Sequence, residues 1–166
     1  MSSIKDMDIT INIVIDTSKI QFINSNDIYN HFSGYLYERI CWFVRDKHAV
    51  ANINVSSRGE SLSKDNLINF LKSHNSKFNI DYSKIKQLKI YPNSQKKLLQ
   101  LADCCCSSLG QALKYKDKTH YKYINYIKEK FYKYKNNCIG YGLKYVPGII
   151  NPANEFKDLL AYLNIK

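Results

Sequence analysis

The segment Ile9–Asp16, ITINIVID, indicates the class of fold to which the chain belongs. Isoleucine occupies positions 9, 11, 13 and 15, and a period of two in β-branched residues predicts a strand with one buried face. The strand ends on the carboxylate of Asp16. Because ligands collect at the carboxyl ends of strands in α/β sheets, Asp16 is the first candidate functional residue.

Helix and strand patterns alternate outward from this strand to about residue 115. An apolar stripe from Ile28 to Phe43, with spacings of three and four, predicts a helix that ends near Asp46. Strands are then predicted over 49–55 and 85–91, and helices from 63 to about 73–75 and over 95–115. This order predicts an α/β fold in which a short, mostly parallel sheet of three strands is flanked by helices.

The chain changes character after Tyr115. Residues 115–135 are rich in Lys and Tyr and are predicted to form a helix, 138–147 an extended segment that contains glycine, and 152–166 a short helix. We find no internal repeat and no long linker in the sequence. A single domain over 1–166 is therefore expected, with its core over about 9–115 and a basic helix and tail over 116–166.

Composition narrows the class of protein. Hydrophobic residues make up 45% of the 166 residues and aromatic residues 13%, which is enough to build a core and excludes disorder throughout. The sequence lacks a run of about 18 apolar residues, and its polar start does not have the pattern of a signal peptide. We expect a soluble, cytoplasmic protein with no membrane partner.

The net charge of +11 is carried by the second half of the chain. Residues 1–83 hold nine basic and nine acidic side chains, whereas residues 84–166 hold 16 basic and five acidic ones. Such asymmetry indicates a polyanionic partner, of which nucleic acid, either DNA or RNA, is the commonest. The alternative is an A·T-rich coding sequence that favours Lys, Asn, Ile and Tyr, with the lysines forming a solvated face.

The five cysteines are Cys41, Cys104, Cys105, Cys106 and Cys138. Their odd number, with no secretory signal, indicates reduced thiols rather than a disulfide framework. Three consecutive cysteines on a helix point about 100° apart, so they cannot all bind one metal ion. We predict that they are small, buried packing residues.

Two carboxylates stand among apolar neighbours in the predicted helices, Glu38 and Asp103. A carboxylate buried in such surroundings must be paired or must bind a cation. Convergent carboxylates would favour Mg²⁺ or Mn²⁺, which suit in-line attack on a phosphodiester. The alternative is a set of structural ion pairs, Asp103 with Arg58 and Glu38 with Arg45 or Arg39.

The segment Lys114–Lys135 is the other functional candidate. It holds eight Lys, six Tyr and two acidic residues, a net charge of +6 over 22 residues. Lysine attracts phosphate whatever the base sequence, and tyrosine rings either stack on unpaired bases or pack beneath lysine stems. Together with Arg58, the residues predicted to bind nucleic acid are Lys114, Lys116, Lys118, Lys122, Lys130 and Lys133.

Four stretches resemble motifs of one bacterial family. They are NHFSGYLYERICWFVRD (30–46), SSRGESL (56–62), KLLQLADCCCSSLGQAL (97–113) and GYGLKYVP (140–147). In the same order, the bacterial domain-of-unknown-function family 3800 shows a Leu-Leu-Glu-Arg-Ile-Ser-Trp helix, a Ser-Asn-Arg-Gly turn, a Leu-Gln-Ile-Ala-Asp-Ala-Val-Ala-Ser-Ser helix and a Gly-Tyr-Gly-Leu-Lys tail. The resemblance spans roughly residues 9–148.

This resemblance implies a ribonuclease H-like fold in which carboxylates hold divalent metal for phosphodiester cleavage. Glu38 and Asp103 match the family's helix acids, whereas Asp16 matches only by its place at a strand end, because the family's opening strand with Asp-Glu-Ser-Gly has no counterpart. Two arrangements remain open. Either Asp16, Glu38 and Asp103 form a reduced metal site, or a second copy of this chain or another chain completes the sheet.

Two hypotheses about function follow. In the first, the chain is a nuclease dependent on Mg²⁺ or Mn²⁺, or derives from one, with Asp16, Glu38 and Asp103 as catalytic residues and metal ligands. In the second, it is a non-catalytic nucleic-acid-binding or protein-interaction module with a degenerate ribonuclease H-like site. Fold alone does not establish an activity, so the choice between them depends on the site.

Overall fold

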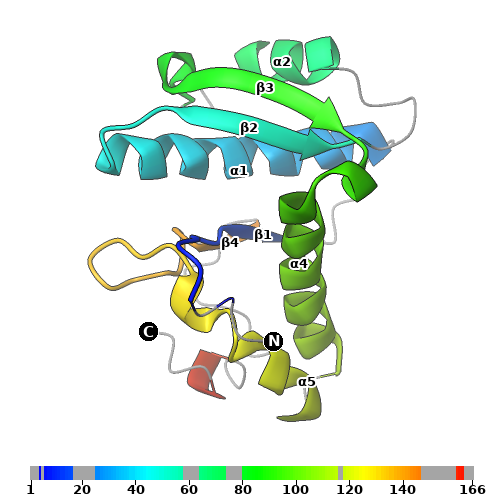
Figure 1. Cartoon of the computed structure of the whole chain (residues 1–166), viewed down its shortest axis with the longest axis vertical. Coiled ribbons are helices and arrows are strands. Elements are labelled where there is room, and N and C mark those ends of the chain that lie inside the picture. Colours follow the sequence, from blue (N-terminus) through cyan, green and yellow to red (C-terminus); the bar gives the residue numbers. More distant parts are fainter. Residues whose placement is uncertain are drawn as a thin grey trace. The chain divides into compact units, whose positions relative to one another are not determined.

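The computed structural model describes residues 4, 6–16, 25–57, 64–73, 80–115, 118–146 and 160–162. It has mixed α/β structure (Figure 1) and divides into two compact units. One unit, called here the middle unit, is residues 19–100. The other, called the terminal unit, joins residues 1–18 to residues 101–166.

A parallel pair of strands forms the sheet of the middle unit. β2 (Ala51–Ser56) pairs with β3 (Ile85–Tyr91), and α2 (Lys64–Ser73) lies between them in the chain. α1 (Ser25–Asp46) precedes β2, and a short 3-10 turn, η2 (Tyr82–Lys84), leads into β3. In Figure 1 the two strands lie side by side with α1 and α2 along them.

The register of β2 and β3 separates an apolar face from a polar one. Ile53 lies opposite Leu88 and both are buried, whereas Asn52 opposite Gln87 is exposed. Side chains of α1 and α2 complete the core on the apolar face, because the alternation of the strands and the helical period place apolar groups toward one another. The buried residues of this core are Tyr37, Cys41, Ile53, Leu67, Leu71, Ile80 and Leu88.

The carboxyl end of α1 closes in a Schellman motif. The amide of Ala49 donates to the carbonyl of Val44 at 2.8 Å, and that of His48 donates to the carbonyl of Arg45 at 3.0 Å. His48 takes the left-handed conformation that this motif requires, with φ of 50°. A glycine fills this place in many proteins, since a side chain there is strained.

A second parallel pair lies in the terminal unit. β1 (Ile13–Asp16) pairs with β4 (Leu143–Val146), so that Asp16 stands opposite Val146. α4 (Lys97–Tyr115) begins in the middle unit and continues into this one, followed by α5 (Lys118–Ile124) and the 3-10 turn η4 (Lys128–Lys130). The buried core residues are Ile11, Ile13, Cys105, Leu109, Ala112, Tyr121, Ile124, Ile127, Phe131, Cys138 and Leu143.

A glycine turn brings β4 against the chain that follows η4. Gly140 has φ of 83°, and the amide of Leu143 donates to the carbonyl of Cys138 at 2.8 Å. Gly142 lies so close to Tyr132 that a Cβ atom there would stand 2.5 Å from the Tyr132 carbonyl oxygen. The expected glycine-containing extended segment is therefore a turn followed by a strand.

Several sequence expectations are corrected by this arrangement. The prediction of one sheet from the first three strands is wrong for the described residues, because β1 pairs with β4 and β2 pairs with β3. The predicted helix over 115–135 is wrong beyond residue 124, where turns and η4 replace it. Of the helix predicted over 152–166, only 160–162 lies within the described residues, and it is helical.

The boundary between core and tail also differs from the expected one. The N-terminal strand and the segment expected to be an appendage, 116–166, belong to one compact unit, and 19–100 to the other. On α4, Leu98 and Ala102 are exposed, whereas Cys105, Leu109 and Ala112 are buried. Among the described helices, none is long and apolar enough to cross a membrane.

Candidate functional site

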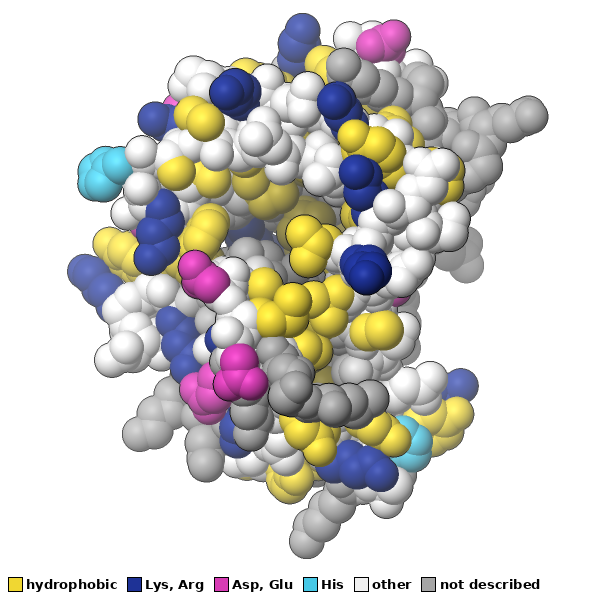
Figure 2. Space-filling model, viewed as in Figure 1, with side chains coloured by type: hydrophobic (Ala, Val, Ile, Leu, Met, Phe, Trp, Pro, Cys, Tyr) yellow, Lys and Arg dark blue, Asp and Glu magenta, His cyan; other side chains and the backbone are white. Residues whose placement is uncertain are grey.

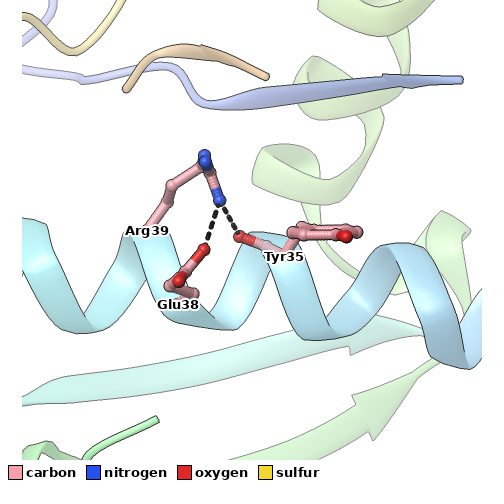
Figure 3. A network of polar contacts seen from close by, with 3 residues as sticks. All are labelled: Tyr35, Glu38 and Arg39. Atoms are coloured by element: carbon pink, nitrogen blue, oxygen red, sulfur yellow. Dashed lines mark hydrogen bonds and ion pairs between the residues drawn. The ribbon is translucent and has the colours of Figure 1, made fainter. Parts of the chain in front are cut away.

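An ion pair on α1 joins two neighbouring residues that the sequence singled out. Nη1 of Arg39 lies 2.8 Å from Oε2 of Glu38 and also donates to the carbonyl oxygen of Tyr35 at 2.8 Å (Figure 3). The guanidinium carbon of Arg39 lies 5.1 Å from the centroid of the Trp42 ring. Consecutive helical side chains diverge, so Arg39 reaches Glu38 only because its long stem turns back along the helix, as Figure 3 shows.

Burial sets the electrostatics of this pair. The side chain of Arg39 is 2% exposed and that of Glu38 is 14% exposed. Burial lowers the pKa of the Arg39 guanidinium below its ordinary value, and the Glu38 carboxylate acts in the opposite direction. Burial also raises the pKa of the Tyr35 hydroxyl, and Glu38 adds to that shift. A buried charge that loses its partner costs several kcal/mol, so Glu38 stabilises Arg39 in its buried position.

The ion pair predicted as the alternative for Glu38 is present, with Arg39 as the partner. Arg45 instead pairs with Asp46 at the end of the helix, where Nε of Arg45 lies 3.9 Å from Oδ1 of Asp46. One carboxylate oxygen of Glu38 is engaged by the guanidinium. A divalent cation at this position would compete with Arg39 for the carboxylate.

The two other predicted acids lie in the terminal unit. Asp103 is exposed on α4, so its charge is solvated and needs no cation to offset burial. Asp16 ends β1 as predicted, and its side chain lies outside what the structure describes. Within the described residues, no group of three or more His, Cys, Asp or Glu side chains is placed to hold a metal ion. Coordination by Asp16, Glu38 and Asp103 stays a prediction.

The structure places the predicted nucleic-acid-binding lysines in different environments. Lys114, Lys122 and Lys133 are exposed, and Lys133 forms an i,i+4 ion pair with Glu129 at 3.4 Å. Lys130 is half-buried and donates to the carbonyl of Met7 at 2.7 Å. Arg58, Lys116 and the side chain of Lys118 lie outside the described residues.

Lysine and tyrosine form repeated pairs on the surface of the terminal unit. The Nζ atom of Lys114 lies 5.1 Å from the ring centroid of Tyr115, and that of Lys122 lies 4.9 Å from that of Tyr123. Lys135 lies 5.6 Å from the ring of its neighbour Tyr134 in the same way. In Figure 2, basic, hydrophobic and histidine side chains gather over α5. Each pair presents a positive charge beside an aromatic face.

The six tyrosines of Lys114–Lys135 divide between packing and exposure. Tyr121 and Tyr132 are buried, which confirms the packing interpretation for these two. Tyr115, Tyr123, Tyr126 and Tyr134 are exposed. Within α5 the helical period explains the difference between Tyr121 and Tyr123, because Tyr121 lies on the side of the helix that packs into the core with Ile124.

One ring contact in this region was not foreseen. The rings of Tyr115, at the end of α4, and His120, in α5, stack with centroids 4.5 Å apart and planes 20° apart. Neither His120 nor Lys135 is among the residues that the sequence predicts to bind nucleic acid. A helix predicted to run without a break through 115–135 would not bring positions 115 and 120 face to face.

The cysteines are only partly the packing residues expected. Cys41, Cys105 and Cys138 are buried, and burial raises the pKa of all three thiols, that of Cys105 to about 11. Cys104 and Cys106 are exposed, so the prediction that the whole group is buried is wrong. All five thiols are free, in agreement with the reduced state expected.

Comparison with known proteins gives no match to this chain. No family model matches it, and no curated protein or solved structure matches it significantly. The assignment of function therefore depends on the chemistry of the surface.

Proposed function

We propose that the chain is a nucleic-acid-binding module that docks the phosphate backbone on the lysines of its terminal unit. The observation that supports it most directly is the set of exposed Lys114, Lys122 and Lys135 side chains, whose ammonium groups lie over exposed tyrosine rings. These contacts keep the charges at the surface, where phosphate can reach them. The excess of 16 basic over five acidic residues in 84–166 favours the same partner.

The weak character of these lysine contacts is consistent with docking. A cation over an exposed aromatic ring gains about 0.5 to 1 kcal/mol, and a phosphate oxygen competes well with such a contact. Lys130, by contrast, is half-buried and donates a hydrogen bond to the backbone carbonyl of Met7, so its role is structural. We therefore assign phosphate contact to Lys114, Lys122 and Lys135 rather than to every lysine of the segment.

A salt titration of binding to a 12-base-pair DNA duplex tests the proposal. Because each phosphate contact releases condensed counterions, log K should fall linearly with log salt concentration, with a slope of about 0.9 per contact. Replacing Lys114, Lys122 and Lys135 together by Gln should reduce that slope by about 2 to 3. The matched control replaces three exposed lysines of the middle unit, Lys72, Lys86 and Lys89, and should leave most of the slope unchanged.

The two triple variants carry the same net charge, which separates local contact from overall attraction. Equal loss of slope in both would refute docking on the terminal unit. A wild-type affinity that does not change with salt would refute phosphate docking altogether.

Metal-dependent cleavage is a second candidate. It is supported by the resemblance to a ribonuclease H-like family and by Asp16, which ends a parallel strand, where α/β proteins commonly bind ligands. In this proposal Asp16, Glu38 and Asp103 hold Mg²⁺ or Mn²⁺, and a second copy of this chain or another chain completes the sheet. Calorimetric titration with Mn²⁺ and cleavage assays on wild type and Asp103→Asn test it, because the substitution should abolish both signals.

A further inference from the structure

The junction of α4 and α5 carries an aromatic stack that faces outward. The Tyr115 and His120 rings lie 4.5 Å apart with their planes 20° from parallel. Tyr115 is 48% exposed, which is high for an aromatic side chain already stacked on another. About half of the Tyr115 side chain therefore stays open to solvent, where another flat group can approach it.

We infer that the Tyr115–His120 stack is a platform for an unpaired base, so that the ligand is single-stranded nucleic acid. This inference rests on the proposed function, because the lysines there supply the attraction for the backbone. Nucleobases have flat faces of the kind that stack on aromatic side chains without regard to base identity. In a duplex, those faces are already stacked on neighbouring bases, so a platform of this kind distinguishes single strands from double strands.

Lys114 connects the platform to the phosphate-binding surface. Its ammonium lies 5.1 Å from the Tyr115 ring centroid, and the side chain is exposed. When a base stacks on the platform, the ammonium can leave the ring and pair with the phosphate next to that base. Stacking and phosphate contact are thus supplied by adjacent residues, which is the combination found in proteins that bind single strands.

The sequence neighbours of the platform support the same ligand. Lys122 and Tyr123 repeat the arrangement on α5, with an exposed lysine 4.9 Å from an exposed ring. Acidic groups are sparse in this part of the chain, where Asp117 and Glu129 stand among eight lysines over 114–135. A polyanion meets little repulsion on such a surface.

Three ligands of equal length test the inference: oligo-dT of 12 nucleotides, oligo-rU of the same length, and a 12-mer of abasic sites that keeps the phosphates. Wild type should bind oligo-dT or oligo-rU more tightly than the abasic strand, and the tighter of the two identifies DNA or RNA as the natural source. Tyr115→Leu should weaken binding to that oligonucleotide by about 5- to 140-fold, which corresponds to about 1 to 3 kcal/mol for a lost stack. Its affinity for the abasic strand should not change.

Two further variants show whether the ring itself is responsible. Tyr115→Phe keeps the aromatic face and should retain the affinity of wild type. Tyr126→Leu removes a tyrosine that is just as exposed, at 50%, from the same unit, and should leave binding within about twofold, because this tyrosine does not belong to the Tyr115–His120 stack. Circular dichroism confirms that each variant folds.

The outcomes separate this inference from the proposed function. If wild type binds the abasic strand and the base-bearing strands equally, or if Tyr115→Leu and Tyr126→Leu lose the same affinity, the platform is refuted while phosphate docking stands. If none of the three strands binds at low salt, the proposed function fails and the platform fails with it.

Discussion

Replacing Gly142 by alanine tests the close packing that holds β4 in place. A Cβ atom there would lie 2.5 Å from the carbonyl oxygen and 2.6 Å from the amide nitrogen of Tyr132, whereas ordinary contact begins near 3.4 Å. The Tyr132 carbonyl oxygen would therefore have to move away by about 0.9 Å, which is the difference between the 3.4 Å of ordinary contact and the 2.5 Å found here. The φ angle of Gly142 is not in the left-handed region, so the cost comes from this contact alone.

The displacement would break hydrogen bonds as well. The amide of Gly142 donates to the Tyr132 carbonyl at 2.9 Å, and its own carbonyl accepts from Ile13 of β1 at 2.8 Å. A shift of this size takes the first bond beyond hydrogen-bonding distance. Overpacking costs about 1 to 3 kcal/mol and an unpaired buried backbone group about 1 to 3 kcal/mol more. The midpoint of thermal unfolding should fall by roughly 4 to 24 °C, at about 2 to 4 °C per kcal/mol.

Thermal unfolding followed by circular dichroism measures this effect, with Gly110→Ala as the matched control. Gly110 lies inside α4 with no atom within 4 Å of the added Cβ, so alanine should stabilise the helix by about 0.5 to 1 kcal/mol. The two glycine substitutions should therefore shift the midpoint in opposite directions. A Gly142→Ala variant as stable as wild type, or a loss of equal size in both variants, would refute the packing argument.

Three further predictions concern other parts of the chain. His48→Gly should raise the free energy of unfolding by about 0.5 to 1 kcal/mol, because glycine relieves the left-handed strain at the end of α1; denaturant titration measures it, and an unchanged midpoint would contradict the Schellman assignment. Cys104 should react first with a thiol reagent, since it is exposed, while burial raises the pKa of the Cys105 thiol to about 11 and also raises the pKa of the Cys106 thiol; peptide mapping of the labelled chain would contradict this if Cys105 or Cys106 reacted first. Asp81→Ala should reduce the loss of stability in acid. The hydrogen bond from the Ser83 side chain lowers the pKa of Asp81 below 3.8. The ionised Asp81 therefore contributes to the free energy of unfolding above pH 3.8, and this contribution disappears as the pH falls through the lowered pKa. An acid unfolding curve identical to that of wild type would show that Asp81 contributes nothing.

Local periodicity predicted the separate elements of the fold well. The apolar stripe from Ile28 to Phe43 became α1, and the alternating residues of 85–91 became β3 with the expected bounds. These predictions depended on contacts within a few residues, which the order of side chains reveals directly. The helix predicted over 115–135 was wrong beyond residue 124, because the hydrophobic spacing there did not show that turns and η4 follow α5.

Pairing of strands could not be read from the same patterns. The sequence predicts that Ile9–Asp16 shares one sheet with the strands at 49–55 and 85–91, but β1 pairs with Leu143–Val146. The segment 138–147 is predicted to be extended, whereas in the structure a turn at Gly140 precedes the strand β4. A parallel pair joins residues distant in sequence, so its register depends on the tertiary core rather than on local propensity.

The candidate site shows the same division. The sequence indicated Glu38 as a residue that needs a partner and offered Arg39 as one choice, but only the structure shows that Arg39 is the more deeply buried of the two. The lysine-rich segment could be predicted from composition, whereas the choice among its lysines could not. Lys130 donates to the Met7 carbonyl, while the ammonium of Lys114 lies over the ring of Tyr115.

The sequence by itself determined the charge of the second half, the mixed α/β class and the order of most helices and strands, because these depend on composition and on short-range periodicity. Tertiary structure alone decided that the first strand joins the end of the chain, that Gly142 must lack a side chain, and that Tyr115 and His120 stack. Each of these requires two segments to meet in space, and the free energy of that meeting comes from packing and hydrogen bonds between them, which no local pattern of residues records.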